Sequence, residues 1–445
     1  MKKIVKFGVI PLLIITIGLM VYNYPRLNII TGFAAKSVCS CTFEAGRDLA
    51  SIEAGDNDIN PVYYAKNVVN EEEKSVTSTV FGLKKRKAIY KQGVGCVLLP
   101  EDYKNIDFKP NRKISNKKLP FPYGNLAQKD TLFFNINYQV LQNAVDKAFD
   151  KEGEQLKRTR AVVVIYKDQI VAEKYSSGFN KDTKLLGWSM TKSITNGVLG
   201  ILEKQGKINV NQTNLFPEWK QDNRAKITLN NLLQMNSGLE WVEDYNNISD
   251  VTKMLFLADD MTEIQLNKPL VNEPNNSWNY SSGTTNLLSR FIRNQFQTHQ
   301  EYLDFWYNEL IDKIGMDSMI IETDNSGNYV GSSYAWATAR DWAKFGLLYL
   351  HNGNWNGEQL LNSSWVHYSK TPTNGSNGEY GAQFWLNAGG VYPNVPRDLF
   401  SCNGYQGQHV FIIPSKDLVV VRFGLAENPL FNIDQFLREV TSAIQ

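Results

Sequence analysis

The chain opens with a long apolar run behind a short basic cluster. Residues 7–22 read FGVIPLLIITIGLMVY and carry no charge, and Lys2, Lys3 and Lys6 precede them. A helix of this run would be about 24 Å long. That length is intermediate between the apolar core of a signal peptide and a short membrane anchor. Lysines ahead of the run place the rest of the chain outside the cytoplasm. We therefore expect residues 1–25 to be a signal peptide or, if uncleaved, a membrane anchor; a buried cytosolic helix is the remaining alternative.

The next hundred residues are polar and have only short apolar stretches. Two such stretches are residues 76–83 and 93–99, and a Pro-containing segment at residues 119–124 ends the region. Short apolar runs between charged segments are typical of strands. We expect residues 26–130 to be a strand-rich N-terminal extension with a linker, and residues 131–445 to be the main domain.

Within the main domain the hydrophobic positions follow regular periods. Residues 138–151 place their apolar side chains on one face of a helix, and residues 161–166 and 170–175 read as strands joined by a three-residue hairpin. Residues 199–342 are mainly helical. Strands and a final helix follow at residues 384–386, 409–413, 418–423 and 431–444. This order predicts an α/β (α+β) sandwich into which an all-α lobe is inserted.

Composition and charge exclude several functions. The 445 residues are 42% hydrophobic and 21% charged, as in ordinary globular proteins, and the net charge of +2 argues against a nucleic-acid partner. No His lies three or four positions from another His or a Cys, so we expect no metal and no cofactor. The four cysteines, Cys39, Cys41, Cys96 and Cys402, allow three full pairings, which stay open.

A candidate nucleophile stands at the start of a predicted helix. Residues 189–192 read SMTK, and apolar residues at helical spacing continue to Gln205, with Gly206 beyond. On this helix Lys192 lies one turn from Ser189 on the same face. A partly desolvated lysine there can take the hydroxyl proton, while the backbone N–H groups of the helix start favour an oxyanion. The alternative is a capping serine beside an exposed lysine.

A second polar turn supplies a candidate proton relay. Residues 278–283 read WNYSSG before another apolar helix, so Tyr280 could deliver its hydroxyl to the nucleophile with Ser282 as its hydrogen-bond partner. The string alone is weak, because several other tyrosines begin the same pattern.

Together these segments resemble the serine β-lactamase-like hydrolases, which include class C β-lactamases, D-alanyl-D-alanine carboxypeptidases, esterases and 6-aminohexanoate-dimer hydrolases. The matching segments, in family order, are residues 189–192, 227–239, 278–283, 337–346 and 404–414. The resemblance implies the β-lactamase/transpeptidase-like antiparallel sheet flanked by helices. It also implies Ser189 as nucleophile, Lys192 as general base, Tyr280 in proton transfer and an acyl-enzyme intermediate.

One family motif is altered. A K-T-G motif or a basic variant should end near Gly404, but residues 401–404 read SCNG, and Lys370 with its following Thr-Pro lies too early to replace it. Without that cation, the carboxylate of a β-lactam or peptidoglycan stem loses its expected partner. The chain resembles the 6-aminohexanoate-dimer hydrolase and esterase branches more in this respect. The oxyanion donors would be the backbone N–H groups of Ser189 and of the strand around Cys402.

Substrate-binding residues are predicted from their place on loops of the family. These are Trp241, Tyr245 and Tyr405, with Ser282, although ordinary core aromatics are an alternative reading. Glu243, Asp244 and Asp250 share one loop and either meet a substrate ammonium or are solvated surface charge.

We therefore expect an exported serine hydrolase, periplasmic or otherwise extracytoplasmic, that acts on a small-molecule amide or ester. A membrane-tethered penicillin-binding-type sensor or peptidase without efficient turnover is the alternative. The sequence leaves the natural substrate and the oligomeric state open.

Overall fold

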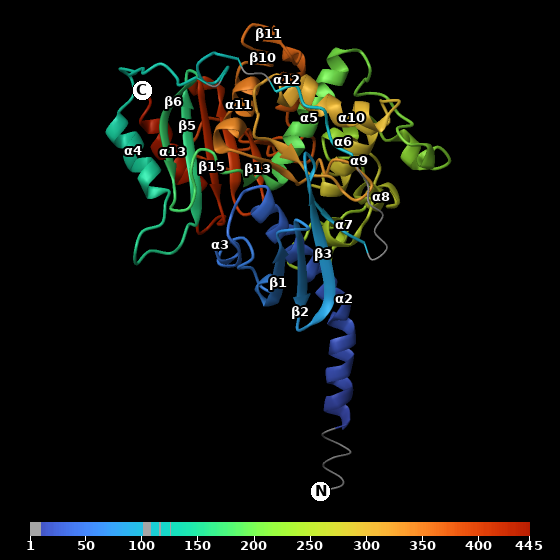
Figure 1. The fold of residues 1–445 in the computed structure, drawn as a ribbon. Coiled ribbons are helices and arrows are strands. Elements are labelled where there is room, and N and C mark those ends of the chain that lie inside the picture. The colour runs from blue at the N-terminus through green and yellow to red at the C-terminus, as the bar shows by residue number, and fades with distance from the viewer. Residues whose placement is uncertain (1–9, 101–107, 115–116, 125) are drawn as a thin grey trace. The chain divides into compact units, whose positions relative to one another are not determined.

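The computed structural model describes residues 10–100, 108–114, 117–124 and 126–445 (Figure 1). The chain divides into two compact units. The first comprises residues 1–91, 96–105 and 244–259, and the second comprises residues 92–95, 106–243 and 260–445. The predicted three-part division at residues 25 and 130 stays a prediction.

The first unit combines a long helix with a four-stranded sheet, as its short apolar runs predict. Its elements are α2 (Ile10–Phe43), α3 (Leu49–Glu53), η2 (Val62–Tyr64), β1 (Ala65–Asn70), β2 (Ser75–Val80), β3 (Leu83–Lys91), β4 (Gly95–Leu98) and α7 (Asp250–Leu257). Helix α2 packs on β2, β3 and α7, where Phe33 lies 5.3 Å from Phe256 between ring centroids. Cys39 and Cys96 form a disulfide, so Cys41 and Cys402 remain thiols.

The expected membrane anchor receives no support from the described residues. None of the helices in this part of the chain is long and apolar enough to cross a membrane. Residues 1–9 of the predicted segment 1–25 lie outside the described residues.

A six-stranded antiparallel sheet forms the centre of the second unit. Its strand order is β12-β13-β14-β15-β5-β6. The strands are β5 (Thr159–Tyr166), β6 (Gln169–Tyr175), β12 (Trp385–Leu386), β13 (Phe400–Gly404), β14 (Gln408–Ile413) and β15 (Leu418–Gly424). Alternate residues of β5 enter two different cores, because successive side chains of a strand point to opposite faces. Val162 and Val164 join one core, and Val163 and Ile165 join the other.

Helices cover both faces of this sheet (Figure 1). Helices α4 (Tyr138–Lys147) and α13 (Ile433–Ser442) pack together on one face, and α11 (Ala339–Leu350) packs on β14 and β15. The helical lobe contains α5 (Thr191–Lys204), α6 (Leu229–Leu233), α8 (Met261–Leu266), α9 (Ser282–Arg293), α10 (His299–Trp306) and α12 (Ser363–Ser369). Short strands add β7 (Leu185–Leu186), β8 (Ile320–Ile321), β9 (Ala335–Ala337), β10 (Asn354–Trp355) and β11 (Glu358–Gln359). The predicted sheet with flanking helices and an inserted helical lobe is confirmed.

The three-residue hairpin expected at residues 167–169 is wrong. Tyr166 pairs with Gln169, so only Lys167 and Asp168 form the turn. Both have positive φ values, 47° and 61°, which is the conformation of a type I′ turn. Such a turn matches the twist of the two strands, and Asp tolerates it better than most residues, so the strand pairing extends one residue further than the hydrophobic pattern indicated.

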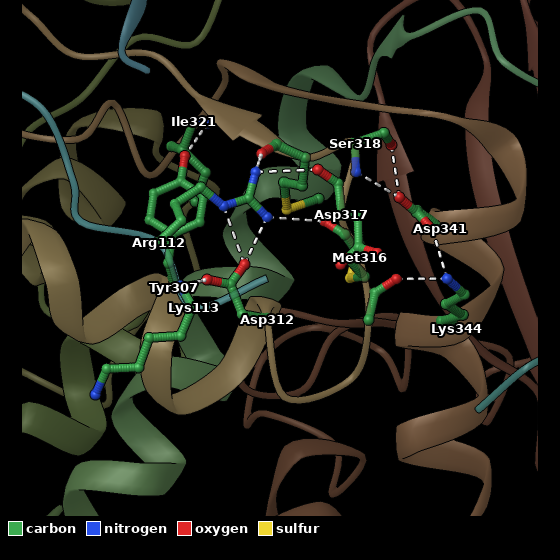
Figure 2. A network of polar contacts seen from close by, with 12 residues as sticks. Arg112, Lys113, Tyr307, Asp312, Met316, Asp317, Ser318, Ile321, Asp341 and Lys344 are labelled. Carbon is green, nitrogen blue, oxygen red and sulfur yellow. Dashed lines mark hydrogen bonds and ion pairs between the residues drawn. The ribbon is translucent and has the colours of Figure 1, made fainter. Parts of the chain in front are cut away.

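Within the second unit, Arg112 holds the segment ahead of α4 against Asp312 (Figure 2). Its guanidinium donates to Oδ1 of Asp312 at 2.5 and 3.0 Å and to the carbonyl oxygen of Met319 at 2.9 Å. The backbone N–H of Lys113 donates to the other Asp312 oxygen at 2.7 Å, and the guanidinium lies 4.6 Å from the centroid of the Tyr307 ring. We refer to these residues as the Arg112 clamp.

Candidate active site

A sharp turn presents Ser189 at the start of α5. Ser189 lies in the single-turn helix η3 (Trp188–Met190), and the preceding Trp188 has a φ of 47°, in the left-handed region that a bulky residue rarely adopts. The turn is tied to β9: Gly187 N–H donates to the Ala335 carbonyl at 2.8 Å, and Ala335 N–H donates to Thr191 Oγ1 at 3.0 Å. The strained turn is thus held by hydrogen bonds to β9. Ser189 itself is half-buried.

Lys192 is buried beneath this serine. Only 2% of the residue is exposed. Among the described residues, Nζ lies 2.9 Å from Ser189 Oγ, 2.9 Å from Ser282 Oγ and 3.0 Å from the carbonyl oxygen of Ser332. The capping-serine reading with an exposed lysine therefore does not describe this site.

Burial changes the acidity of this lysine. Loss of solvation lowers the pKa of Lys192 to about 8, and the nearby Glu243 carboxylate opposes the decrease. An amine with this pKa is partly deprotonated near neutral pH and can accept a proton.

Tyr280 faces the same pair. Its ring centroid lies 4.8 Å from Nζ of Lys192, and Ser189 and Trp385 lie close enough to its hydroxyl to oppose the rise in its pKa. Burial and the Glu243 carboxylate raise the pKa of Tyr280 well above its usual value, so the phenol stays protonated. The rings of Trp385 and Tyr380 pack on it at 5.2 and 5.7 Å. Tyr280 can therefore pass on a proton but does not act as a phenolate base.

Strand β13 passes close to the serine turn. A Cβ atom on Gly404 would lie 2.1 Å from the carbonyl oxygen of Gly187, so only glycine permits this approach. Tyr405 follows, and its ring contacts Trp188 edge-on at 5.6 Å. Cys402 lies on the same strand, buried, and burial raises the pKa of its thiol to about 12. The SCNG segment thus lies beside Ser189, while Lys370 lies outside β13, after α12.

A carboxylate that the sequence left as either a substrate contact or a surface charge belongs to this site. Glu243 Oε1 accepts from the Ser282 hydroxyl at 2.5 Å, and Oε2 accepts from Ser282 N–H at 2.9 Å. Trp241 Nε1 donates to Oε2 at 2.5 Å. The tryptophan that was predicted to bind substrate therefore holds Glu243, and its indole also contacts Gly283. The only signal in the sequence was a Trp and a Glu two positions apart.

The remaining predicted residues divide between the units. Ser282 is fully buried at the first turn of α9, whereas Tyr245 belongs to the first unit, so its substrate role stays a prediction. Trp385, Tyr380 and the Ser332 carbonyl contribute to the site and were not predicted. No group of three or more His, Cys, Asp or Glu residues able to hold a metal occurs among the described residues.

The fold and the site together define a class: a mixed α/β protein with a serine and a buried lysine one turn apart beside an antiparallel sheet. A family model described as Beta-lactamase matches residues 145–429, and the chain belongs to this family of hydrolases. It is 23% identical over 310 residues to the 6-aminohexanoate-dimer hydrolase of Paenarthrobacter ureafaciens, covering 61% of this chain and 74% of that protein.

Solved structures share the fold. A putative 6-aminohexanoate-dimer hydrolase from Bacillus anthracis superposes with a TM-score of 0.56 at 22% identity, covering 70% of this chain and 84% of that one. A family VIII carboxylesterase superposes with a TM-score of 0.55 at 15% identity, covering 69% and 96%. The predicted family is thereby confirmed.

Proposed function

We propose that this protein is a serine hydrolase that cleaves an amide or ester bond through an acyl-enzyme intermediate on Ser189. The observation that carries the proposal is the 2.9 Å distance between Nζ of Lys192 and Oγ of Ser189, with the lysine buried and its pKa lowered to about 8. A serine hydroxyl needs such a base, because it is a weak nucleophile at its own pKa.

Each side chain has a role in this scheme. The Lys192 amine takes the Ser189 proton as Oγ attacks the substrate carbonyl. The backbone N–H of Ser189 and a second N–H from β13, assigned to Cys402, stabilise the oxyanion. Tyr280 delivers the proton to the leaving group as the acyl-enzyme forms. Water then attacks the ester and returns the proton through the same groups.

The substrate is proposed to be a small-molecule amide or ester of the 6-aminohexanoate-dimer or carboxylic-ester kind. Two observations support this choice. Relatives of the chain carry those names, and the segment of β13 beside Ser189 has no Lys or Arg to pair with a β-lactam carboxylate. The partly exposed rings of Trp385 and Tyr405 near the serine suit an aliphatic chain.

Turnover and intact mass of the purified full-length chain test the proposal, with Ser189→Ala as the matched control. The substrates are a short-chain p-nitrophenyl ester, a linear 6-aminohexanoate dimer and a chromogenic β-lactam. We expect hydrolysis of the ester or the dimer that is lost in Ser189→Ala, with the β-lactam spared. A stable adduct on Ser189 without turnover would instead indicate the sensor, and no reaction in either protein would contradict the proposal.

We also propose that the protein is exported. The apolar run behind three lysines supports this location, and so does the Cys39–Cys96 disulfide, because disulfides persist in oxidising compartments. A membrane-impermeant protease applied to cells whose outer envelope has been removed, with the cytoplasmic membrane intact, should degrade the protein while sparing a cytosolic marker. Protection of both proteins, with loss of both after lysis, would contradict export.

A further inference from the structure

The orientation of hydrogen bonds around Lys192 raises a question that the Ser189–Lys192 pair alone does not answer. A neutral amine has two N–H groups and one lone pair, and it acts as a base toward Ser189 only if the lone pair points at that hydroxyl. The other two neighbours of Nζ, Ser282 Oγ and Ser332 O, must then both accept. The Ser332 carbonyl can only accept. The Ser282 hydroxyl can accept or donate.

Glu243 removes this ambiguity. A carboxylate only accepts, so the 2.5 Å contact between Ser282 Oγ and Glu243 Oε1 uses the Ser282 proton. The Ser282 oxygen then offers only its lone pairs to Lys192. We infer that Glu243 is a positioning residue for the proposed reaction: it fixes Ser282 as an acceptor, which turns the lone pair of the Lys192 amine toward Ser189.

The proton inventory of the step balances. In the resting site the amine donates to Ser282 and Ser332 and accepts from Ser189. When Ser189 attacks, its proton moves to Nζ and the new ammonium donates to three oxygens, with Ser189 Oγ now bonded to the substrate carbon. The ammonium later releases that proton toward the leaving group, and Glu243 keeps the Ser282 hydrogen bond throughout.

A purely structural role for Glu243 makes different predictions. Its Oε2 accepts the Ser282 N–H at the first turn of α9, so the carboxylate also stabilises that helix end. A helix cap affects the melting temperature alone. A positioning role affects the rate and its dependence on pH.

The other titratable groups around Lys192 do not carry a charge that competes with Glu243. Tyr280 and Tyr380 have pKa values raised by burial, and so does Tyr334 near the serine turn. Burial likewise raises the pKa of the Cys402 thiol to about 12. These groups are neutral at pH 6–10, which leaves the Glu243 carboxylate to act on the Lys192 ammonium.

The inference rests on the proposed function, so the test measures covalent modification of Ser189 without assuming a substrate: its oxygen attacks phosphorus and fluoride leaves. A fluorophosphonate probe is added to the full-length protein, and the labelling rate is followed by intact mass from pH 5 to 10. Glu243→Gln keeps an acceptor for the Ser282 hydroxyl but removes the charge, whereas Glu243→Ala removes both. Glu240→Gln, an exposed side chain on the same loop, is the matched control.

We expect a graded result. Without the carboxylate charge the Lys192 ammonium is less favoured, so the acid limb of the labelling profile moves to lower pH in both Glu243 variants. The plateau labelling rate stays within about threefold of wild type in Glu243→Gln and falls at least tenfold in Glu243→Ala. A tenfold loss is smaller than the rate factor of about 10²–10⁴ that a general base usually contributes, because Lys192 itself remains. Adding Glu243→Ala to Ser282→Ala should cause no further decrease, because both act through one hydroxyl.

Two outcomes separate the inference from the function. Wild-type labelling at Ser189 with an unchanged rate and pH profile in Glu243→Ala would overturn the inference and leave the hydrolase proposal standing. No labelling of wild-type Ser189 would overturn the proposed function and the inference with it.

Discussion

Two largely buried cations in the second unit are held by opposite kinds of partner. In the Arg112 clamp the guanidinium pairs with the Asp312 carboxylate (Figure 2). The Asp312 side chain is 2% exposed. Lys192 is held by two hydroxyl oxygens and one carbonyl, and the Glu243 carboxylate reaches it only through Ser282. One cation has a full counter-charge and the other does not.

The difference separates stability from chemistry. A guanidinium that is paired with a carboxylate and with backbone carbonyls keeps its charge and fastens two segments together. A buried ammonium without a direct counter-charge is disfavoured, so the pKa of Lys192 falls to about 8 and the amine can exchange a proton. Removing each cation should therefore damage a different property.

The largest effect is expected when the Lys192 amine is removed. In Lys192→Met, kcat/KM for ester or dimer should fall by about 10³–10⁴-fold, because the serine loses its base. The melting temperature should not decrease, since the desolvated ammonium is removed with its charge. Steady-state kinetics and a thermal melt check both parts, and residual activity within tenfold of wild type would contradict the role of Lys192.

The matching change on the other side is Arg112→Met. It leaves the Asp312 carboxylate buried without its cation, so the free energy of unfolding should fall by about 3–5 kcal/mol. The activity of the molecules that remain folded should not change.

Chemical denaturation measures the Arg112→Met effect, and Arg112→Met/Asp312→Asn is its control. The double variant should recover part of the loss because no unpaired charge remains. A decrease in the unfolding free energy below about 1 kcal/mol in Arg112→Met would show that the clamp is only a surface ion pair.

The pH dependence of the reaction sharpens the comparison further. Because only the neutral amine accepts a proton, kcat/KM should be level above the Lys192 pKa of about 8 and should fall about tenfold per pH unit below it. The values are measured with an ester substrate, and the rates are corrected for spontaneous hydrolysis. A kcat/KM that stays constant from pH 9 to 6 would contradict the role of Lys192 as the base.

The smallest expected effect concerns Trp241, which contacts Lys192 only indirectly, through Glu243 and Ser282. Trp241→Phe removes the hydrogen bond from Nε1 to Glu243 and keeps an aromatic ring near Gly283. We expect kcat to fall about 2- to 10-fold, the size of one net hydrogen bond, with KM unchanged. An increase in KM with unchanged kcat would favour the substrate contact predicted from the sequence.

Local periodicity was sufficient to predict that Ser189 and Lys192 lie together, whereas their roles as nucleophile and base came from the family resemblance and belong to the proposed function. Ser189 and Lys192 are three positions apart at a helix start, and helix geometry alone places them on one face. The same holds for β5, whose apolar run predicted a strand with both faces buried. The predicted loop of the following hairpin was one residue too long, because the conformation of Asp168 depends on the twist of the paired strands and not on hydrophobicity.

The sequence by itself determined the order of the elements, the family and the pairing of Ser189 with Lys192, the two residues that the proposed function makes nucleophile and base. Only the tertiary structure decided the basicity and orientation of the Lys192 amine, because its partners Ser282 and Ser332 lie 90 and 140 residues away in the chain. Glu243 became part of the site for the same reason, through Ser282 at a separation of 39 residues. Burial and hydrogen-bond direction set the lysine's basicity, and both depend on groups that only the folded chain brings together.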